Sequence, residues 1–128
     1  MGLDISFYKQ SKLDPRYYER VGWFGKVNFL LTYFGIDDLF NCDTITVTKE
    51  MLSNLITDTN AEIIHRNLDV DNKEPLNEKL KTKKVFFGGS TDYDDSYWDN
   101  IEMVRDWANK VIKEIEWDKD DLKMMASW

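Results

Sequence analysis

The stretch that decides the fold is VFFGGSTDYDDSYWDNIEMVRDWANKVIKEI, residues 85–115. Its short apolar run is stopped by Gly88-Gly89, which predicts a buried strand over 84–87. Apolar residues then recur every three or four positions with charged residues between them, which predicts a helix over 93–116. These apolar residues are Trp98, Ile101, Val104, Ala108, Val111, Ile112 and Ile115. Thr91, with Asp94 three positions later, resembles a capping box at the start of this helix.

The segments before this stretch predict two more strands and two more helices. Leu3, Ile5 and Phe7 alternate with more polar residues, which is typical of a half-buried strand. Thr48 is a suitable N-cap and precedes apolar residues at helical spacing. The predicted elements are strands over 3–8 and 44–47 and helices over 22–34 and 48–64.

Two segments have weaker patterns. Residues 66–84 are polar and contain Pro75, so we expect a long surface excursion there. The tail, residues 117–128, either docks through its apolar side chains or frays. The predicted fold is α+β, with a small, mainly antiparallel sheet packed against about three helices in a single domain.

Length and composition restrict the classes of protein that the sequence can encode. A chain of 128 residues with 42% hydrophobic residues suits one compact domain. It has no long apolar run, and Asp4 lies where a signal peptide would be basic, so we expect no membrane association and a cytoplasmic location. The chain has one cysteine and one histidine, which excludes an internal disulfide and the usual Cys/His zinc site. We predict no cofactor.

The acidic charge is concentrated at one end of the chain. Residues 90–128 hold 11 of the 24 acidic residues and only 5 of the 17 basic ones. Such a segment repels nucleic acid and attracts basic surfaces, including the grooves of nucleic-acid enzymes. We therefore expect no direct binding of nucleic acid, although an acidic, solvated helix face would have the same composition.

The glycine loop resembles two known kinds of ligand-binding loop but fits neither. A phosphate-binding loop needs a lysine and a hydroxyl residue at the helix start, whereas this loop has three aspartates that would repel a phosphate. A calcium loop that began at Asp92 would need glycine at its sixth position and glutamate at its twelfth. Tyr97 and Met103 occupy those positions. Helix capping by the acidic side chains is the favoured explanation, and we predict no metal site, with generic divalent-ion binding as the alternative.

Catalytic chemistry has little support in the sequence. His65 lies near a predicted helix end, where the helix dipole favours a protonated imidazole, and Cys42 lies in a different segment. The carboxylates are too numerous for any pair to stand out as general acid and base. The protein is therefore more plausibly a binding protein than an enzyme.

Tyrosines and carboxylates occur together around the start of the last predicted helix. Aromatic anchors beside acidic residues are typical of a surface that binds a basic protein partner. The residues assigned to this surface are Asp92, Tyr93, Asp94, Asp95, Tyr97, Asp99, Glu102 and Asp106.

Three separated motifs resemble a family of small proteins from bacteriophage and prophage genomes. They are the start MGLD, the segment around Trp23, Lys26 and Asn28, and a segment FFGGSTDYDDSYW at 86–98, whose Gly89-Ser90 spacing differs from the family's. The resemblance implies a phage protein acting in an infected bacterium, and small acidic phage proteins are frequently inhibitors of host defence. Our leading hypothesis is an anti-CRISPR-like, non-enzymatic inhibitor that binds a basic host protein, with mimicry of nucleic acid as one route.

The main alternative is a small-ligand or nucleotide-binding protein or enzyme. Its pocket would lie between the predicted helix over 22–34 and the loop over 88–95. The residues expected to line it are Trp23, Lys26, Asn28, Tyr93 and Asp94.

Overall fold

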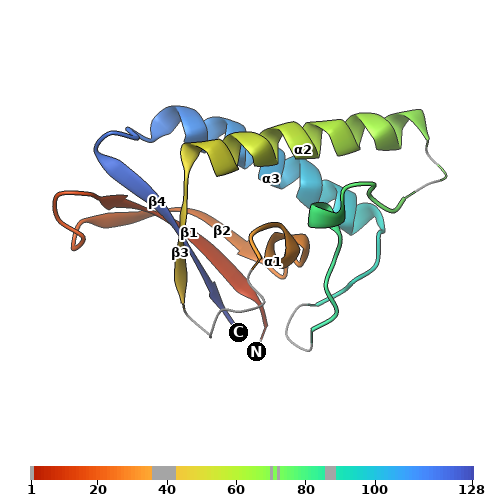
Figure 1. Cartoon of the computed structure of the whole chain (residues 1–128). Coiled ribbons are helices and arrows are strands. Elements are labelled where there is room, and N and C mark those ends of the chain that lie inside the picture. Colours follow the sequence, from red (N-terminus) through yellow and green to blue (C-terminus); the bar gives the residue numbers. More distant parts are fainter. Residues whose placement is uncertain (1, 36–42, 70, 72, 86–88) are drawn as a thin grey trace.

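The computed structural model describes residues 2–35, 43–69, 71, 73–85 and 89–128. Within these residues the fold is α+β, as predicted, and Figure 1 shows a four-stranded sheet with the long helices on one side of it. The elements in chain order are β1 (Asp4–Ser11), β2 (Tyr18–Gly25), α1 (Phe29–Tyr33), β3 (Thr44–Val47), α2 (Lys49–Leu68), the 3-10 turn η2 (Glu78–Leu80), α3 (Asp95–Glu114) and β4 (Asp120–Ser127).

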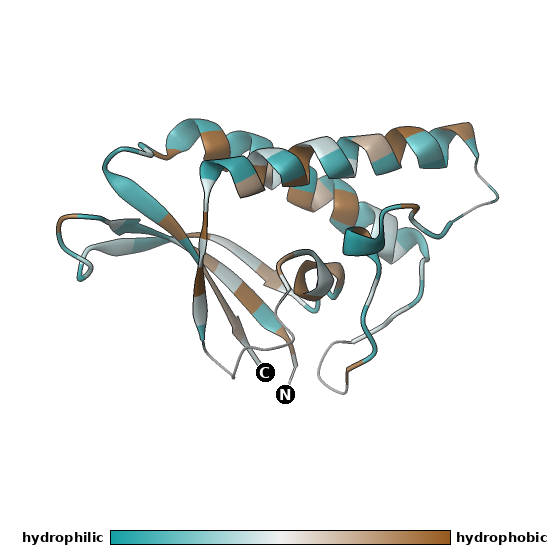
Figure 2. Ribbon diagram, in the orientation of Figure 1, coloured by the Kyte–Doolittle hydropathy of each residue, from teal (hydrophilic) through white to brown (hydrophobic). Residues whose placement is uncertain are grey.

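The sheet is antiparallel throughout, with strand order β2-β1-β4-β3. The predicted first strand exists and extends to Ser11, beyond the expected end at Tyr8. The C-terminal tail forms β4, one of the two central strands, because Leu122, Met124 and Ala126 alternate into the core. Figure 2 shows this alternation of hydrophobic and hydrophilic residues along the strands.

In the strand predicted over 84–87, the residues that the structure describes are not part of a strand. Lys84 and Val85 lie in an irregular segment, and Phe86 and Phe87 are outside the described residues. A strand that was not predicted, β4, is central instead and pairs with both β1 and β3.

The predicted helix over 22–34 is wrong over its first half. Strand β2 runs to Gly25, and only Phe29–Tyr33 is helical. Two glycines lower the helix propensity of the segment, and the sheet requires one of them. Gly22 faces the indole of Trp107, and a Cβ at Gly22 would lie 2.5 Å from Nε1 of that indole. This close approach admits only glycine.

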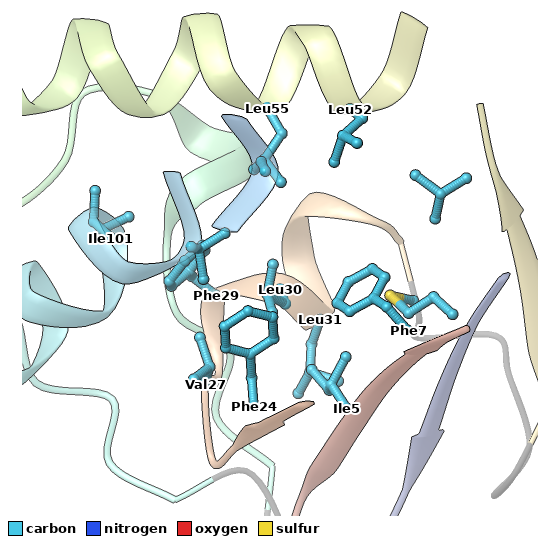
Figure 3. Close-up of a cluster of buried hydrophobic side chains, with 14 of the residues drawn as sticks. Ile5, Phe7, Phe24, Val27, Phe29, Leu30, Leu31, Leu52, Leu55 and Ile101 are labelled. Carbon is cyan, nitrogen blue, oxygen red and sulfur yellow. The ribbon is translucent and has the colours of Figure 1, made fainter. Parts of the chain in front are cut away.

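The two long helices were predicted correctly in place and type. The Thr48 hydroxyl caps α2 by accepting a hydrogen bond from the Met51 amide, and α2 extends to Leu68 rather than ending at Ile64. Helix α3 buries the apolar face that its periodicity indicated. Figure 3 shows Leu52 and Leu55 of α2 pointing toward α1 and the sheet. The core therefore fills the space between one face of the sheet and the helical layer.

The predicted surface excursion over 66–84 is anchored to the helices at several points. The Glu62 side chain is only 4% exposed, and its carboxylate accepts hydrogen bonds from the amides of Leu76 and Asn77 at 3.0 and 2.7 Å. The indole of Trp98 donates to the carbonyl of Lys73 at 2.9 Å. Buried polar groups thus hold this segment against α2 and α3.

Candidate functional site

The start of α3 fixes the geometry of the acidic surface. The N-cap is Asp94, whose carboxylate accepts a hydrogen bond from the Tyr97 amide at 3.1 Å. The cap predicted at Thr91 is therefore wrong, because the chain is not yet helical at that residue. Aspartate is a strong cap because its charge also interacts favourably with the positive end of the helix. The cap leaves the following carboxylates on a regular helix.

Four exposed carboxylates form one line along α3, and we call this line the acidic stripe. Its members are Asp95, Asp99, Glu102 and Asp106. Their spacing of four, three and four residues places them on the same side of the helix. At a rise of 1.5 Å per residue, the stripe is roughly 16 Å long. Asp92 is also exposed and lies three residues before the first residue of the helix.

Two arginines partly neutralise the ends of the acidic stripe. Arg66 of α2 lies 3.7 Å from Asp95 and stacks over the ring of Trp98, with 5.4 Å between the guanidinium carbon and the ring centroid. Arg105 lies 3.0 Å from Asp106. No residue in the described part of the chain forms an ion pair with the two central carboxylates, Asp99 and Glu102. The middle of the stripe thus carries the available negative charge.

A hollow of about 240 Å³ lies beside the acidic stripe, between α2 and α3. Arg66, Asp95, Trp98, Asp99 and Glu102 are among the residues that line it. The stripe is therefore not a flat surface, and a long basic side chain of a partner could enter the hollow and meet three carboxylates.

The two tyrosines expected on the acidic surface have structural roles instead. Tyr97 is 5% exposed and donates a hydrogen bond to the Leu80 carbonyl at 2.6 Å, and its burial raises the pKa of the phenol above its usual value. Tyr93 is half-buried, and its hydroxyl accepts a hydrogen bond from the Thr82 amide at 3.1 Å. Tyr97 lies four positions before Ile101, on the buried face of α3, which explains why it is not exposed.

The residues of the alternative pocket are brought together in part. Lys26, Asn28 and Asp94 line a hollow of about 240 Å³, whereas Trp23 lines a different one. Tyr93 is not among the residues that line either hollow. Asn28 is 4% exposed, and its side-chain amide donates to the Lys83 carbonyl and accepts from the Lys83 amide. Asn28 therefore supports the wall of the hollow. Lys26 has a positive φ of 58°, which is uncommon for a residue other than glycine.

Four polar residues of this hollow were not among those expected to line the pocket, although Asp92 was assigned to the acidic surface and Ser90 lies in the loop over 88–95. Ser90, Asp92, Ser96 and Asn100 line it together with the residues named above. Ser96 and Asn100 are one helical turn apart at the start of α3, so their common face could have been recognised from the sequence. They lie near Lys26 because β2 ends at Gly25, and the incorrect prediction of a helix over 22–34 did not include this strand.

The remaining sequence hypotheses concern metals, catalysis and membranes. No group of three or more metal-ligating side chains occurs among the residues whose positions are described. His65 lies in the last turn of α2, as expected, and Cys42 is outside the described residues. In the part of the chain that the structure covers, no helix is both long and apolar enough to cross a membrane.

Comparisons with known proteins found no matching protein family, curated protein or solved structure.

Proposed function

We propose that this protein is a non-enzymatic inhibitor that binds a basic surface of a host-defence protein through its acidic stripe. The observation that carries the proposal is the regular spacing of Asp95, Asp99, Glu102 and Asp106 on one exposed helix face. The resemblance to phage and prophage proteins supplies the setting, which is the cytoplasm of an infected bacterium. A nucleic-acid-guided nuclease is the kind of partner that this charge pattern suits.

The charge pattern supports mimicry of a nucleic-acid backbone. Neighbouring carboxylates on the stripe are one helical turn apart, about 5–6 Å, so they form a regular row of negative charges, as the phosphates of a nucleic-acid strand do. Asp99 and Glu102 can accept hydrogen bonds from arginine or lysine side chains that normally bind phosphate. The ion pair of Arg66 with the exposed Asp95 is long, at 3.7 Å, and such surface pairs contribute at most about 1 kcal/mol, so a partner's arginine can displace it at little cost.

Cleavage assays with a panel of nucleic-acid-guided nucleases test the proposal. We expect the protein to reduce cleavage by at least one nuclease, and the inhibition to weaken as salt is raised, because exposed charges are screened. The double variant Asp99→Lys/Glu102→Lys should lose the inhibition. The matched control is Glu116→Lys/Asp118→Lys, which makes the same charge change at exposed residues outside the stripe. Equal inhibition by both variants would refute a role for the stripe.

A second candidate function is binding of a small polar ligand in the hollow beside Lys26. The observation in its favour is that Lys26, Asp92 and Asp94, from two distant segments, line one hollow together. A ligand that binds there should raise the melting temperature of the protein in a screen of nucleotides and amino acids. Lys26→Ala should abolish that shift, whereas Lys110→Ala, a change on the exposed side of α3, should preserve it.

A further inference from the structure

The side of the sheet opposite the helices carries exposed aromatic and basic side chains, and we call it the open face. Alternate residues of each strand point to it, because Ile5, Phe7, Leu122 and Met124 fill the core side. None of the described helices lies on this side (Figure 1). Its most distinctive members are Tyr8, Tyr18, Arg20, Trp23, Lys123 and Met125.

Two hollows on the open face each combine an aromatic ring with a lysine. The first, of about 380 Å³, is lined by Tyr8, Tyr18 and Lys123, and the two tyrosine rings meet edge to face at 5.9 Å. The second, of about 410 Å³, is lined by Trp23 and Lys26, with Asp4 beside them. Trp23 is 54% exposed and Tyr18 is 65% exposed, so both rings are available to a ligand.

The strand register places cations on both sides of one central ring. Tyr8 is paired with Arg20 on β2 and with Lys123 on β4. Because neighbouring strands are about 4.8 Å apart, the two cations are about 10 Å from one another across the sheet. The Lys123 ammonium donates to the Thr46 hydroxyl at 2.6 Å, which holds it on this face.

We propose that the open face binds single-stranded RNA. Bases would stack on Tyr18 and Trp23, and phosphates would contact Arg20, Lys26 and Lys123. On the neighbouring strand β1, Trp23 pairs with Ser6 and Tyr18 pairs with Gln10, so the two aromatic residues are four residues of β1 apart. This separation is about 13 Å, which spans a few nucleotides of an extended strand.

Polar groups in the first hollow favour RNA over DNA. The side chains of Gln10 and Thr44 line it beside the tyrosines. A 2′-hydroxyl can both donate to and accept from such groups, and DNA lacks it. These side chains therefore offer a reason for preferring ribose at this position.

The net charge of −7 does not oppose this site, because the excess acid lies elsewhere. The acidic stripe belongs to the helical layer, on the other side of the sheet. On the open face, the strands present Arg20 and Lys123 with Asp4 and Asp121. Asp121 in turn lies 3.8 Å from the Lys12 ammonium. This inference departs from the expectation that the protein binds no nucleic acid directly, which rested on the summed charge of residues 90–128, and it is independent of the proposed inhibitor function.

Fluorescence anisotropy with a labelled, mixed-sequence RNA of about ten nucleotides tests the proposal, at about 50 mM salt. We expect saturable binding to the intact protein. Trp23→Ala and Tyr18→Ala should each raise the dissociation constant roughly tenfold, because each removes one stacking ring. Both residues are exposed, and an unchanged melting temperature would show that the variants fold.

Two variants that each remove one positive charge distinguish a phosphate contact on the open face from a general effect of net charge. Arg20→Gln should reduce the slope of log affinity against log salt by about 0.7, the value for one phosphate contact on a single strand. Lys110→Gln removes the same charge from the helical layer and should not change the slope. The absence of RNA binding, or an equal effect of the two variants, would overturn the proposal, and equally tight binding of the same DNA sequence would overturn the assignment to RNA.

Discussion

Replacement of Gly22 by alanine should destabilise the protein by about 2–4 kcal/mol. The added Cβ would lie 2.5, 2.7 and 2.9 Å from three atoms of the Trp107 indole. That ring cannot move away easily, because it packs on Phe7 and Phe24 with centroid distances of 4.3 and 5.3 Å, and it donates to the Val21 carbonyl at 2.8 Å. Overpacking costs about 1–3 kcal/mol, and loss of the hydrogen bond costs about 1 kcal/mol more.

The sign of this change distinguishes a strand from a helix at Gly22. If residues 22–34 formed a helix, as their spacing suggested, Gly22→Ala would stabilise the protein by about 1 kcal/mol. Urea unfolding, followed by circular dichroism, measures the difference in free energy. Gly25→Ala is the matched control, because the three atoms nearest to its Cβ belong to the ring of Trp23, which is 54% exposed and can turn aside. A Gly22→Ala variant as stable as the parent, or more stable, would refute the packing described here.

Three further predictions concern the contacts that hold the site. Asp94→Ala should lower the free energy of unfolding by about 1 kcal/mol, because it removes the cap of α3, whereas Thr91→Ala should change it little; urea unfolding of both variants measures the contrast. Glu62→Gln should cost about 1–3 kcal/mol and speed hydrogen exchange at the Leu76 and Asn77 amides, since an amide group has one acceptor for two donors. Burial raises the pKa of the Tyr97 phenol above 10, so just above that pH only the unfolded state loses the phenol proton. This residue should therefore lower the free energy of unfolding by about 1.4 kcal/mol per pH unit there. Urea unfolding between about pH 9 and 11 should show a smaller fall in Tyr97→Phe than in the parent, and an equal fall in both proteins would contradict the burial.

The two long helices, α2 and α3, could be predicted from sequence because local patterns determine them. The apolar repeat of α3 and the Thr48 cap of α2 are properties of short segments. The strands were harder, because pairing partners are distant in the sequence. The alternation of Leu122, Met124 and Ala126 was present in the tail, but only pairing with β1 makes β4 a central strand.

The candidate site was predictable only where it depends on one element. The acidic stripe follows from helical spacing alone, and so does the burial of Tyr97, which lies one turn before Ile101. By contrast, the meeting of Lys26 with Asp94 depends on where β2 ends relative to α3. The open face depends on the strand order, which no local pattern specifies.

The central claim is that the acidic stripe binds a basic partner, and the most direct test is a comparison of two dissociation constants. A nuclease that the protein inhibits should be titrated with Asp99→Lys/Glu102→Lys and with Glu116→Lys/Asp118→Lys at about 150 mM salt. We predict that the first variant binds at least about tenfold more weakly than the second, because it places lysines opposite the partner's basic side chains. Equal dissociation constants for the two variants would contradict the claim.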